Sequence, residues 1–170
     1  ITPKTRAILP VHMNGLSAPM DDYLEIAARH PHPKCGPLKV IGDAARACGG
    51  GYKGTKIGKL GWMTAFSFHT MKLMSTLGEG GMITTDDEAL VNRIRNIRQW
   101  GGGEEWGTSY KITKPQAAVG SVQLGRLDDM LALRVRRARE RQEMLQDIPE
   151  LTLTYEPPEC DHTFYLNTLL

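Results

Sequence analysis

The stretch FSFHTMKLMSTLGEGG, residues 66–81, places a single lysine, Lys72, between an apolar run and a glycine cluster. The apolar start predicts a strand that ends just before the lysine. A lysine in a low-dielectric setting prefers to be neutral, and a neutral amine can form a Schiff base with a carbonyl. The alternative is an ordinary lysine in a surface loop, so the residues around it have to decide.

Composition and charge are those of an ordinary soluble domain. The chain has 170 residues, of which 41% are hydrophobic and 24% charged, and its formal net charge is +2. These values fit one globular domain with a core of its own. The densest basic run spans Arg134 to Arg141, but acidic residues interleave with it. A solvated helix face is therefore favoured over nucleic-acid binding, and no nucleic-acid partner is expected.

Cysteine usage and hydropathy indicate a cytoplasmic protein. Cys35, Cys48 and Cys160 are an odd number without metal-like pairing, which favours reduced thiols. No apolar stretch approaches membrane-spanning length and no signal peptide is visible, so no membrane partner is expected. The chain begins at Ile1 without an initiator methionine and ends on the apolar run HTFYLNTLL. We therefore expect a fragment of a longer protein.

Strands and helices alternate along the sequence. Apolar runs predict strands at 6–12, 38–45, 63–69 and 80–86, with a glycine-rich loop or small hairpin at 49–61 and two short strand-like pieces at the end. Helical spacing is found at 17–30, 86–101 and from Thr113 to about Gln146, with Ser17 as an N-cap and Thr113 and Gln116 as a capping box. This order predicts parallel strands in an α/β layer fold.

Three features near Lys72 point to a cofactor. Asp43 follows an apolar run, so it lies at the carboxyl end of a strand, where open α/β sheets bind ligands. There it could keep the ring nitrogen of pyridoxal phosphate protonated, or simply cap a helix. Ser67 could hold a phosphate, or be an ordinary strand serine. The glycines of the opening stretch could pass closely under a flat cofactor, or make a turn.

Residues 40–101, VIGDAARACGGGYKGTKIGKLGWMTAFSFHTMKLMSTLGEGGMITTDDEALVNRIRNIRQWG, resemble the DegT/StrS group of sugar aminotransferases. The group's pattern is an aspartate-alanine-alanine turn, a YKG…G.LG loop, an FSF strand, a lysine and GEGG, all present here in order. The resemblance extends through RAILPVHMNG upstream and YKITKPQAAVGSVQLGRLDDM downstream. It implies the three-layer, aspartate aminotransferase-like large domain of fold-type I enzymes, with a mostly parallel sheet flanked by helices, incomplete at both ends. Residues 1–147 would be that cofactor-binding domain and the long helix after it, and residues 148–170 the start of a small domain.

The resemblance also implies a role for each site residue. Lys72 would bind pyridoxal 5'-phosphate as a Schiff base and move a proton between substrate and cofactor carbons. Asp43 would pair with the pyridine nitrogen, and Ser67 would contact the phosphate. Arg46, three residues after the aspartate, would lie against the ring or its phenolic oxygen. Ser109 occupies the position that reaches across a dimer interface to the neighbour's phosphate, so a homodimer is implied.

The sequence departs from the group's pattern at four positions. Arg46 stands where glutamine or histidine is usual, and its fixed positive charge would alter the electronics of the ring. Ser109 replaces an asparagine and is shorter, and Lys111 replaces an arginine. Gly42 replaces a common acidic residue, and no chemical effect is expected from that change.

Two histidines complete the candidate set. His12 ends the first predicted strand, on the same edge as Asp43 if the strands are parallel, and could face the cofactor or be structural. His69 lies two residues after Ser67, so strand alternation places both on one face, near the cofactor.

The implied reaction is transamination in two halves. Glutamate or glutamine would donate an amino group, which then passes to a keto-sugar, expected to be nucleotide-linked, for amino sugar and polysaccharide biosynthesis. Three alternatives stay open: a related dehydratase branch, in which histidine replaces the lysine and which Lys72 opposes; a non-catalytic or regulatory relative; and an α/β interaction domain without cofactor.

Overall fold

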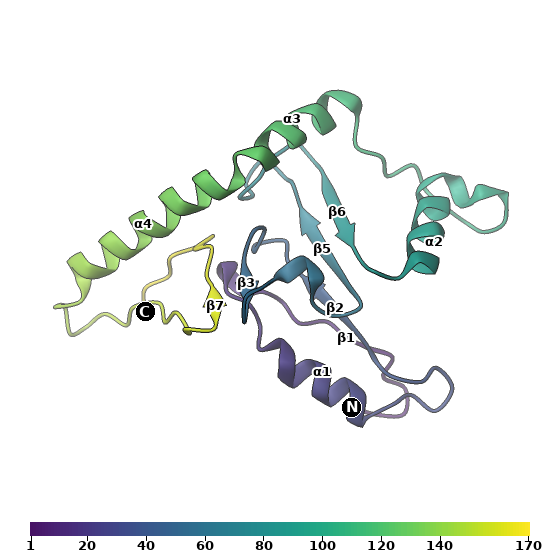
Figure 1. The fold of residues 1–170 in the computed structure, drawn as a ribbon, viewed down its shortest axis with the longest axis horizontal. Helices are drawn as coiled ribbons and strands as arrows, with labels where there is room; N and C mark the ends of the chain where they lie inside the picture. The colour runs from purple at the N-terminus through teal and green to yellow at the C-terminus, as the bar shows by residue number, and fades with distance from the viewer.

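The computed structural model describes all 170 residues and centres on a four-stranded sheet with the strand order β1-β2-β5-β6 (Figure 1). These strands are β1 (Ala7–Ile8), β2 (Lys39–Asp43), β5 (Met63–Ser67) and β6 (Gly81–Thr84). β1, β2 and β5 are parallel, and β6 runs antiparallel to β5. A mostly parallel sheet is therefore confirmed. β6 reverses direction because loop 68–80 contains no crossover helix.

The first strand is shorter than the predicted 6–12. Pro10 has no backbone N–H to donate, so regular pairing stops at Ile8. Pairing resumes at Val11, which forms an isolated parallel bridge to Asp43. The chain at residues 10–12 therefore still follows β2 to its carboxyl end.

Helix α1 (Met20–Arg29) packs on one face of the sheet, against its β1–β2 part (Figure 1). Met20 and Ala27 of this helix are buried in one cluster with Leu38 and Val40. The predicted cap is wrong: residue Pro19, not Ser17, precedes the helix, and the Ser17 hydroxyl donates to the Ala18 carbonyl over 2.9 Å.

The opposite face of the sheet is open. Leu9, Val11 and Ile83 expose 63%, 44% and 45% of their surface. Side chains on alternate positions of a strand point to opposite faces, so one face of this sheet is core and the other is free to receive a ligand or further chain.

A second, three-stranded sheet joins the two ends of the chain. Its antiparallel order is β4 (Thr55–Lys56), β3 (Gly51–Tyr52) and β7 (Cys160–Asp161), so the predicted hairpin at 49–61 is confirmed. Two short closing strands were predicted, and β7 is the one regular strand in this part of the chain. The rest of the closing segment is irregular, although Thr152 and Leu170 exchange two backbone hydrogen bonds of 2.6 and 3.1 Å.

The closing segment packs tightly on a turn near the start of the chain. The N–H of Thr163 donates to the Gly15 carbonyl over 3.0 Å, and that of Leu166 to the Asn14 carbonyl over 3.3 Å. Gly15 has φ +96°, and a Cβ there would lie 2.3 Å from the Thr163 hydroxyl oxygen. Only glycine fits, because it combines positive φ with no side chain.

Helix α2 (Glu88–Arg98) lies within the predicted helical stretch 86–101. The Asp87 carboxylate accepts the N–H of Leu90 over 3.0 Å and the indole N–H of Trp62 over 2.9 Å. Both hydrogen bonds lower the pKa of Asp87, and the bond from the Leu90 backbone N–H has the larger effect. The same carboxylate thus caps the helix and ties it to the start of β5.

The long helix predicted from Thr113 to about Gln146 is two helices, α3 (Lys114–Gly125) and α4 (Leu127–Leu145). Arg126 between them has φ −106° and ψ 0°, outside regular helix geometry, and Gly125 before it is a poor helix former. The side-chain oxygen of Gln116 accepts the Thr113 N–H over 3.2 Å, as one half of a capping box does.

The basic run lies on α4 and is solvated. All five of its arginines are exposed, and three of them pair with Glu140 or Glu156. Three 3-10 turns complete the fold: η1 (Met13–Gly15), η2 (Ile57–Lys59) and η3 (Trp100–Gly103). None of the helices is both long and apolar enough to cross a membrane.

Candidate functional site at the carboxyl edge of the parallel strands

Asp43 and Ser67 lie on the open face of the sheet. Asp43 ends β2 and is in register with Ala65 of β5, and Ser67 follows two residues later on the same face. Ala65 is exposed and carries only a methyl group, so no large side chain fills the surface between the Asp43 carboxylate and the Ser67 hydroxyl; we call this surface the open floor. One Asp43 oxygen accepts the N–H of Ala45 over 3.0 Å, which fixes the carboxylate at the strand end.

Lys72 lies on the loop that leaves β5. Its N–H donates to the His69 carbonyl over 2.9 Å, and that of Thr70 to the Gly78 carbonyl over 3.0 Å. A Cβ at Gly81 would lie 2.7 Å from the Phe66 carbonyl oxygen, so β6 can pass this closely only with glycine there. The loop is thus a compact hairpin-like turn, and Lys72 on it is half-buried.

His69 holds this loop together. Its Nδ1 accepts the N–H of Met71 over 3.1 Å, which places the ring proton on Nε2, and Nε2 lies 3.5 Å from a carboxylate oxygen of Glu79. Its own N–H donates to the Ser67 hydroxyl oxygen over 3.4 Å. The contacts of the imidazole are therefore with its own loop, immediately beside Ser67.

Tyr165 lies over Lys72 and was not anticipated from the sequence. Its ring centroid is 5.4 Å from the Lys72 ammonium nitrogen, and its hydroxyl donates to the Met71 carbonyl over 3.1 Å. The sequence placed this tyrosine in an apolar closing strand. Only the packing of residues 163–166 on the turn at Gly15 brings it to the site, so no local pattern could have found it.

Arg46, in the turn that follows β2, lies near the same Tyr165 ring. Its guanidinium carbon is 5.8 Å from the Tyr165 ring centroid. One of its nitrogens contacts Asn14 Oδ1 at 3.4 Å and Met13 Sδ at 3.7 Å. The structure therefore brings the predicted residues Arg46 and Lys72 to one tyrosine.

His12 lies beneath the site, on the covered face. It is completely buried, its Nδ1 accepts the N–H of Ala18 over 3.2 Å, and its Nε2 has no hydrogen-bond partner. A Cβ at Gly42 would lie 3.0 Å from that Nε2. Burial lowers the pKa of His12 to about 4 although the nearby charge of Asp43 opposes the shift. Its backbone N–H donates to the Asp43 carbonyl over 3.0 Å, so His12 supports the strand end from below.

Ser109 is not brought to this group. It is exposed in the segment between η3 and α3, and its carbonyl accepts the N–H of Lys111 over 2.7 Å. The Lys111 ammonium donates to the Gln99 side chain over 2.9 Å. The cross-dimer role expected for Ser109 stays a prediction.

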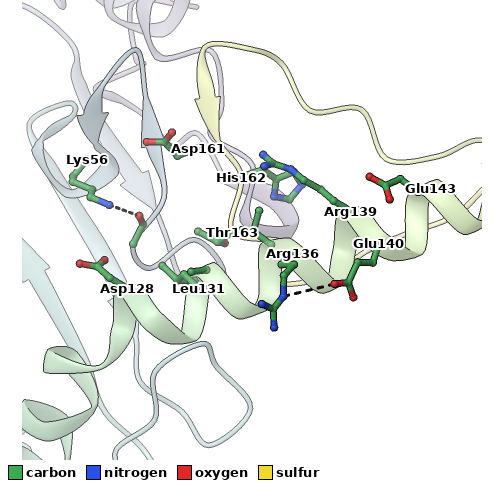
Figure 2. A pocket seen from close by; sticks show the side chains of 13 residues that line it. Lys56, Asp128, Leu131, Arg136, Arg139, Glu140, Glu143, Asp161, His162 and Thr163 are labelled. Atoms are coloured by element: carbon green, nitrogen blue, oxygen red, sulfur yellow. Dashed lines mark hydrogen bonds and ion pairs between the residues drawn. The ribbon is translucent and has the colours of Figure 1, made fainter.

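A hollow of about 590 Å³ lies elsewhere, between α4 and the β7 segment (Figure 2). Charges of both signs line it, among them Lys56, Asp128 and Arg136. Lys56 donates to the Gly49 carbonyl over 2.8 Å, and Arg136 pairs with a glutamate of its own helix. Neither Asp43 nor Lys72 lines this hollow, so it is separate from the predicted site.

The residues present fit a flat, phosphorylated heterocycle. The open floor at Ala65 separates a carboxylate at one strand end from a hydroxyl at the next, and an amine follows on the adjoining loop. A carboxylate suits a protonated ring nitrogen, a hydroxyl with strand-end N–H groups suits a phosphate, and an amine suits an aldehyde.

A sheet of parallel strands with a carboxylate, a hydroxyl and a loop lysine at its carboxyl edge defines an α/β protein of the ligand-binding class. The chain belongs to the DegT/DnrJ/EryC1/StrS aminotransferase family, whose profile matches residues 1–170. Aminotransferases of this family depend on pyridoxal phosphate. The predicted family is therefore confirmed.

Individual relatives agree with this assignment. The chain is 46% identical to the GDP-perosamine synthase of Caulobacter vibrioides over 143 residues, 80% of this chain and 37% of the relative. It is 36% identical to the dTDP-3-amino-3,4,6-trideoxy-alpha-D-glucose transaminase of Streptomyces venezuelae over 174 residues, 99% of this chain and 44% of the relative.

Solved structures confirm the fold. The crystal structure of DesV from S. venezuelae in complex with a ketimine intermediate is similar with a TM-score of 0.93 and 36% identity, covering 99% of this chain and 45% of that one. A family aminotransferase from Brucella abortus has a TM-score of 0.87 and 29% identity, covering 96% of this chain and 43% of that one. The chain thus spans less than half the length of these relatives.

Proposed function

We propose that the full-length protein is a pyridoxal-phosphate-dependent aminotransferase that transfers the amino group of glutamate or glutamine to a nucleotide-linked keto-sugar. The observation that carries this proposal is the register of Asp43 with Ala65, which puts Asp43 and Ser67 on one open face beside the Lys72 loop. The names of two relatives contain a nucleotide-linked amino sugar, GDP-perosamine and dTDP-3-amino-3,4,6-trideoxy-alpha-D-glucose, and this supports a nucleotide-linked keto-sugar as the substrate class.

Each residue then has a chemical task. Pyridoxal phosphate supplies, when bound, an aldehyde that condenses with amines and a ring that withdraws electrons. The Lys72 amine would hold the aldehyde carbon and carry the proton that is moved in each half of the transfer. The Asp43 carboxylate would keep the ring nitrogen protonated, and the Ser67 hydroxyl would donate to the phosphate.

Loop geometry supports these tasks. The backbone N–H of Lys72 donates to the His69 carbonyl, and the Tyr165 ring lies 5.4 Å from the Lys72 ammonium nitrogen; both contacts support an amine presented beside the open face of the sheet. His69, proposed from the sequence as a cofactor contact, would act beside Ser67 and set the position of the loop. Positioning of this kind lowers the entropic cost of reaction.

A homodimer belongs to the same proposal. Trp106, Tyr110, Val122 and Leu124 expose 84%, 84%, 62% and 57% of their surface in the part of the chain that runs from the end of η3 through α3 and contains Ser109. Exposed apolar groups of this size support a subunit interface. The division into a large domain (1–147) and the start of a small domain (148–170) and the cytoplasmic location are also proposals, the latter supported by three cysteines without disulfides.

The test uses the full-length protein and two lysine variants. Wild type mixed with pyridoxal phosphate is expected to absorb in the visible range, and borohydride is expected to fix the cofactor to the peptide that contains Lys72. Lys72→Ala should lose both signals. Lys59→Ala, which removes an exposed lysine from η2, is the matched control and should retain them. Retention of both signals in Lys72→Ala would overturn the assignment.

Adding an amino donor distinguishes the proposed enzyme from a non-catalytic relative. The unusual Arg46 is an argument for the non-catalytic relative. Glutamate or glutamine should bleach the visible absorption of wild type, and a keto-sugar nucleotide should restore it. Absorption that persists in both donors would favour the non-catalytic relative, and the absence of any cofactor binding would favour an interaction domain.

A further inference from the structure

We propose that Arg46, held against the ring of Tyr165, is the receptor for the carboxylate of the amino donor. This inference rests on the proposed function and deepens it, because it assigns the donor a binding residue within the site. It differs from the cofactor contact expected of this position from the sequence.

The hydrogen-bonding capacity of Arg46 is largely unused. A guanidinium has five N–H donors, yet only one nitrogen of Arg46 makes contacts, at 3.4 Å to Asn14 Oδ1 and 3.7 Å to Met13 Sδ. Seven ion pairs form in the chain, and Arg46 takes part in none of them. A half-buried cation without an acidic partner is suited to an anion from outside.

Tyr165 fixes how this cation is presented. The ring lies 5.8 Å from the guanidinium carbon, within cation–π range, and its hydroxyl is tied to the Met71 carbonyl at 3.1 Å. A contact with the aromatic ring leaves the N–H edge of the guanidinium available. That planar edge matches the two oxygens of a carboxylate, which arginine binds with two parallel hydrogen bonds.

The position of Lys72 indicates which carboxylate is bound. Its ammonium nitrogen lies 5.4 Å from the centroid of the same ring, so the reactive amine and the guanidinium are arranged around one side chain. An α-amino acid carries an amine that must reach the cofactor at Lys72 and a carboxylate that needs a cation nearby. A nucleotide-linked keto-sugar has no such pair of groups.

The experiment measures binding of maleate, a dicarboxylate that has no amine and cannot react. Isothermal titration calorimetry is performed on the full-length protein with its cofactor, on Arg46→Gln, and on Arg46→Lys, which keeps the charge but not the planar fork. Arg95→Gln removes an exposed arginine from α2 and is the control for net charge. Thermal melting of each variant shows that it is folded.

Arg46→Gln is expected to weaken maleate binding by at least about tenfold, with Arg46→Lys intermediate and Arg95→Gln unchanged. The concentration of glutamate that half-bleaches the visible absorption should rise in the same order. Maleate affinity within twofold of wild type in Arg46→Gln would overturn the inference. So would a change confined to the pH dependence of the absorption, since Arg46 would then serve the cofactor's phenolic oxygen alone.

The failure of this inference can be told from failure of the proposed function. Calorimetry needs no colour, so maleate binding that depends on Arg46 would support the carboxylate receptor even in a protein that forms no covalent bond at Lys72. Inorganic phosphate is titrated in parallel. Stronger dependence on Arg46 for phosphate than for maleate would also overturn the inference, because it would assign the cation to a phosphoryl group.

Discussion

The hydroxyl of Tyr165 donates a 3.1 Å hydrogen bond to the carbonyl of Met71, the residue directly before Lys72. The two residues are 94 positions apart in the sequence. The bond therefore makes the position of the reactive loop depend on the packing of the closing segment.

Tyr165→Phe removes the hydrogen bond and keeps the ring. We expect cofactor affinity in the full-length protein to fall about fivefold, because one hydrogen bond of about 1 kcal/mol no longer holds the loop. Tyr165→Leu should cost more, since the cation–π contacts are lost as well. Titration of the visible absorption measures both, with the exposed Tyr155→Phe as the control. Equal affinities for the Phe and Leu variants would contradict a role for the ring.

His12→Asn tests the buried imidazole. Because the pKa of His12 is lowered to about 4 in the fold, the unfolded chain, with an ordinary value of 6.5, binds the proton more readily. Stability is therefore complete above pH 6.5 and falls by up to about 3 kcal/mol as the pH drops from 6.5 to 4.

Asparagine can still accept the Ala18 N–H but does not titrate. His12→Asn should be less stable than wild type at pH 7, where packing is lost, and should show a shallower decline between pH 6.5 and 4. Urea unfolding at several pH values measures this difference. An unchanged slope would mean that other groups cause the acid sensitivity.

Gly15→Ala should loosen the closing segment. The new methyl group would lie 2.3 Å from the Thr163 hydroxyl oxygen, and alanine would have to adopt the positive φ of Gly15. We therefore expect the free energy of unfolding to fall by about 2 kcal/mol or more. Gly36→Ala is the matched control, because Gly36 has φ +71° with nothing within 4 Å of its Cβ. It should lose only about 1 kcal/mol through backbone strain. Similar losses measured by chemical unfolding would show that contact with Thr163 is unimportant.

Two variants distinguish a role of His69 in holding its loop from a direct contact with the cofactor. His69→Asn can retain an acceptor for the Met71 N–H, whereas His69→Leu cannot. If the imidazole acts by holding the loop, cofactor affinity should fall about fivefold in the leucine variant and stay close to wild type in the asparagine variant. Equal losses in both would instead assign a direct contact to the ring. The visible absorption titration used for Tyr165 distinguishes the two outcomes.

The sheet and its edge could be predicted from local sequence, because apolar runs specify strands and strand ends specify the ligand edge of an α/β layer. Asp43, Ser67 and Lys72 could be located near that edge from the strand pattern, whereas their roles came from the family resemblance and stay predictions. The break at Arg126 could not be found, since the apolar spacing continues through it. Ser17 was assigned to the wrong role because a serine before a helix can cap it or bond elsewhere, and here its hydroxyl donates to the Ala18 carbonyl.

Long-range packing explains what was missed at the site. Tyr165 occurs in an apolar run that is typical of a strand, and its position over Lys72 depends on Thr163 meeting Gly15, with a sequence separation of 148 residues. Arg46 was recognised as unusual, but the aromatic ring that it shares with Lys72 was not. No motif of neighbouring residues encodes such a contact.

The hydrogen bond between Tyr165 and Met71 can form only late in the synthesis of the chain. The two residues are 94 positions apart, so a ribosome adding about 5–20 residues per second makes the tyrosine roughly 5–20 s after the loop that it covers. Until then the nascent chain can display Lys72 without its cover, and the finished lysine environment exists only after translation has passed the closing segment.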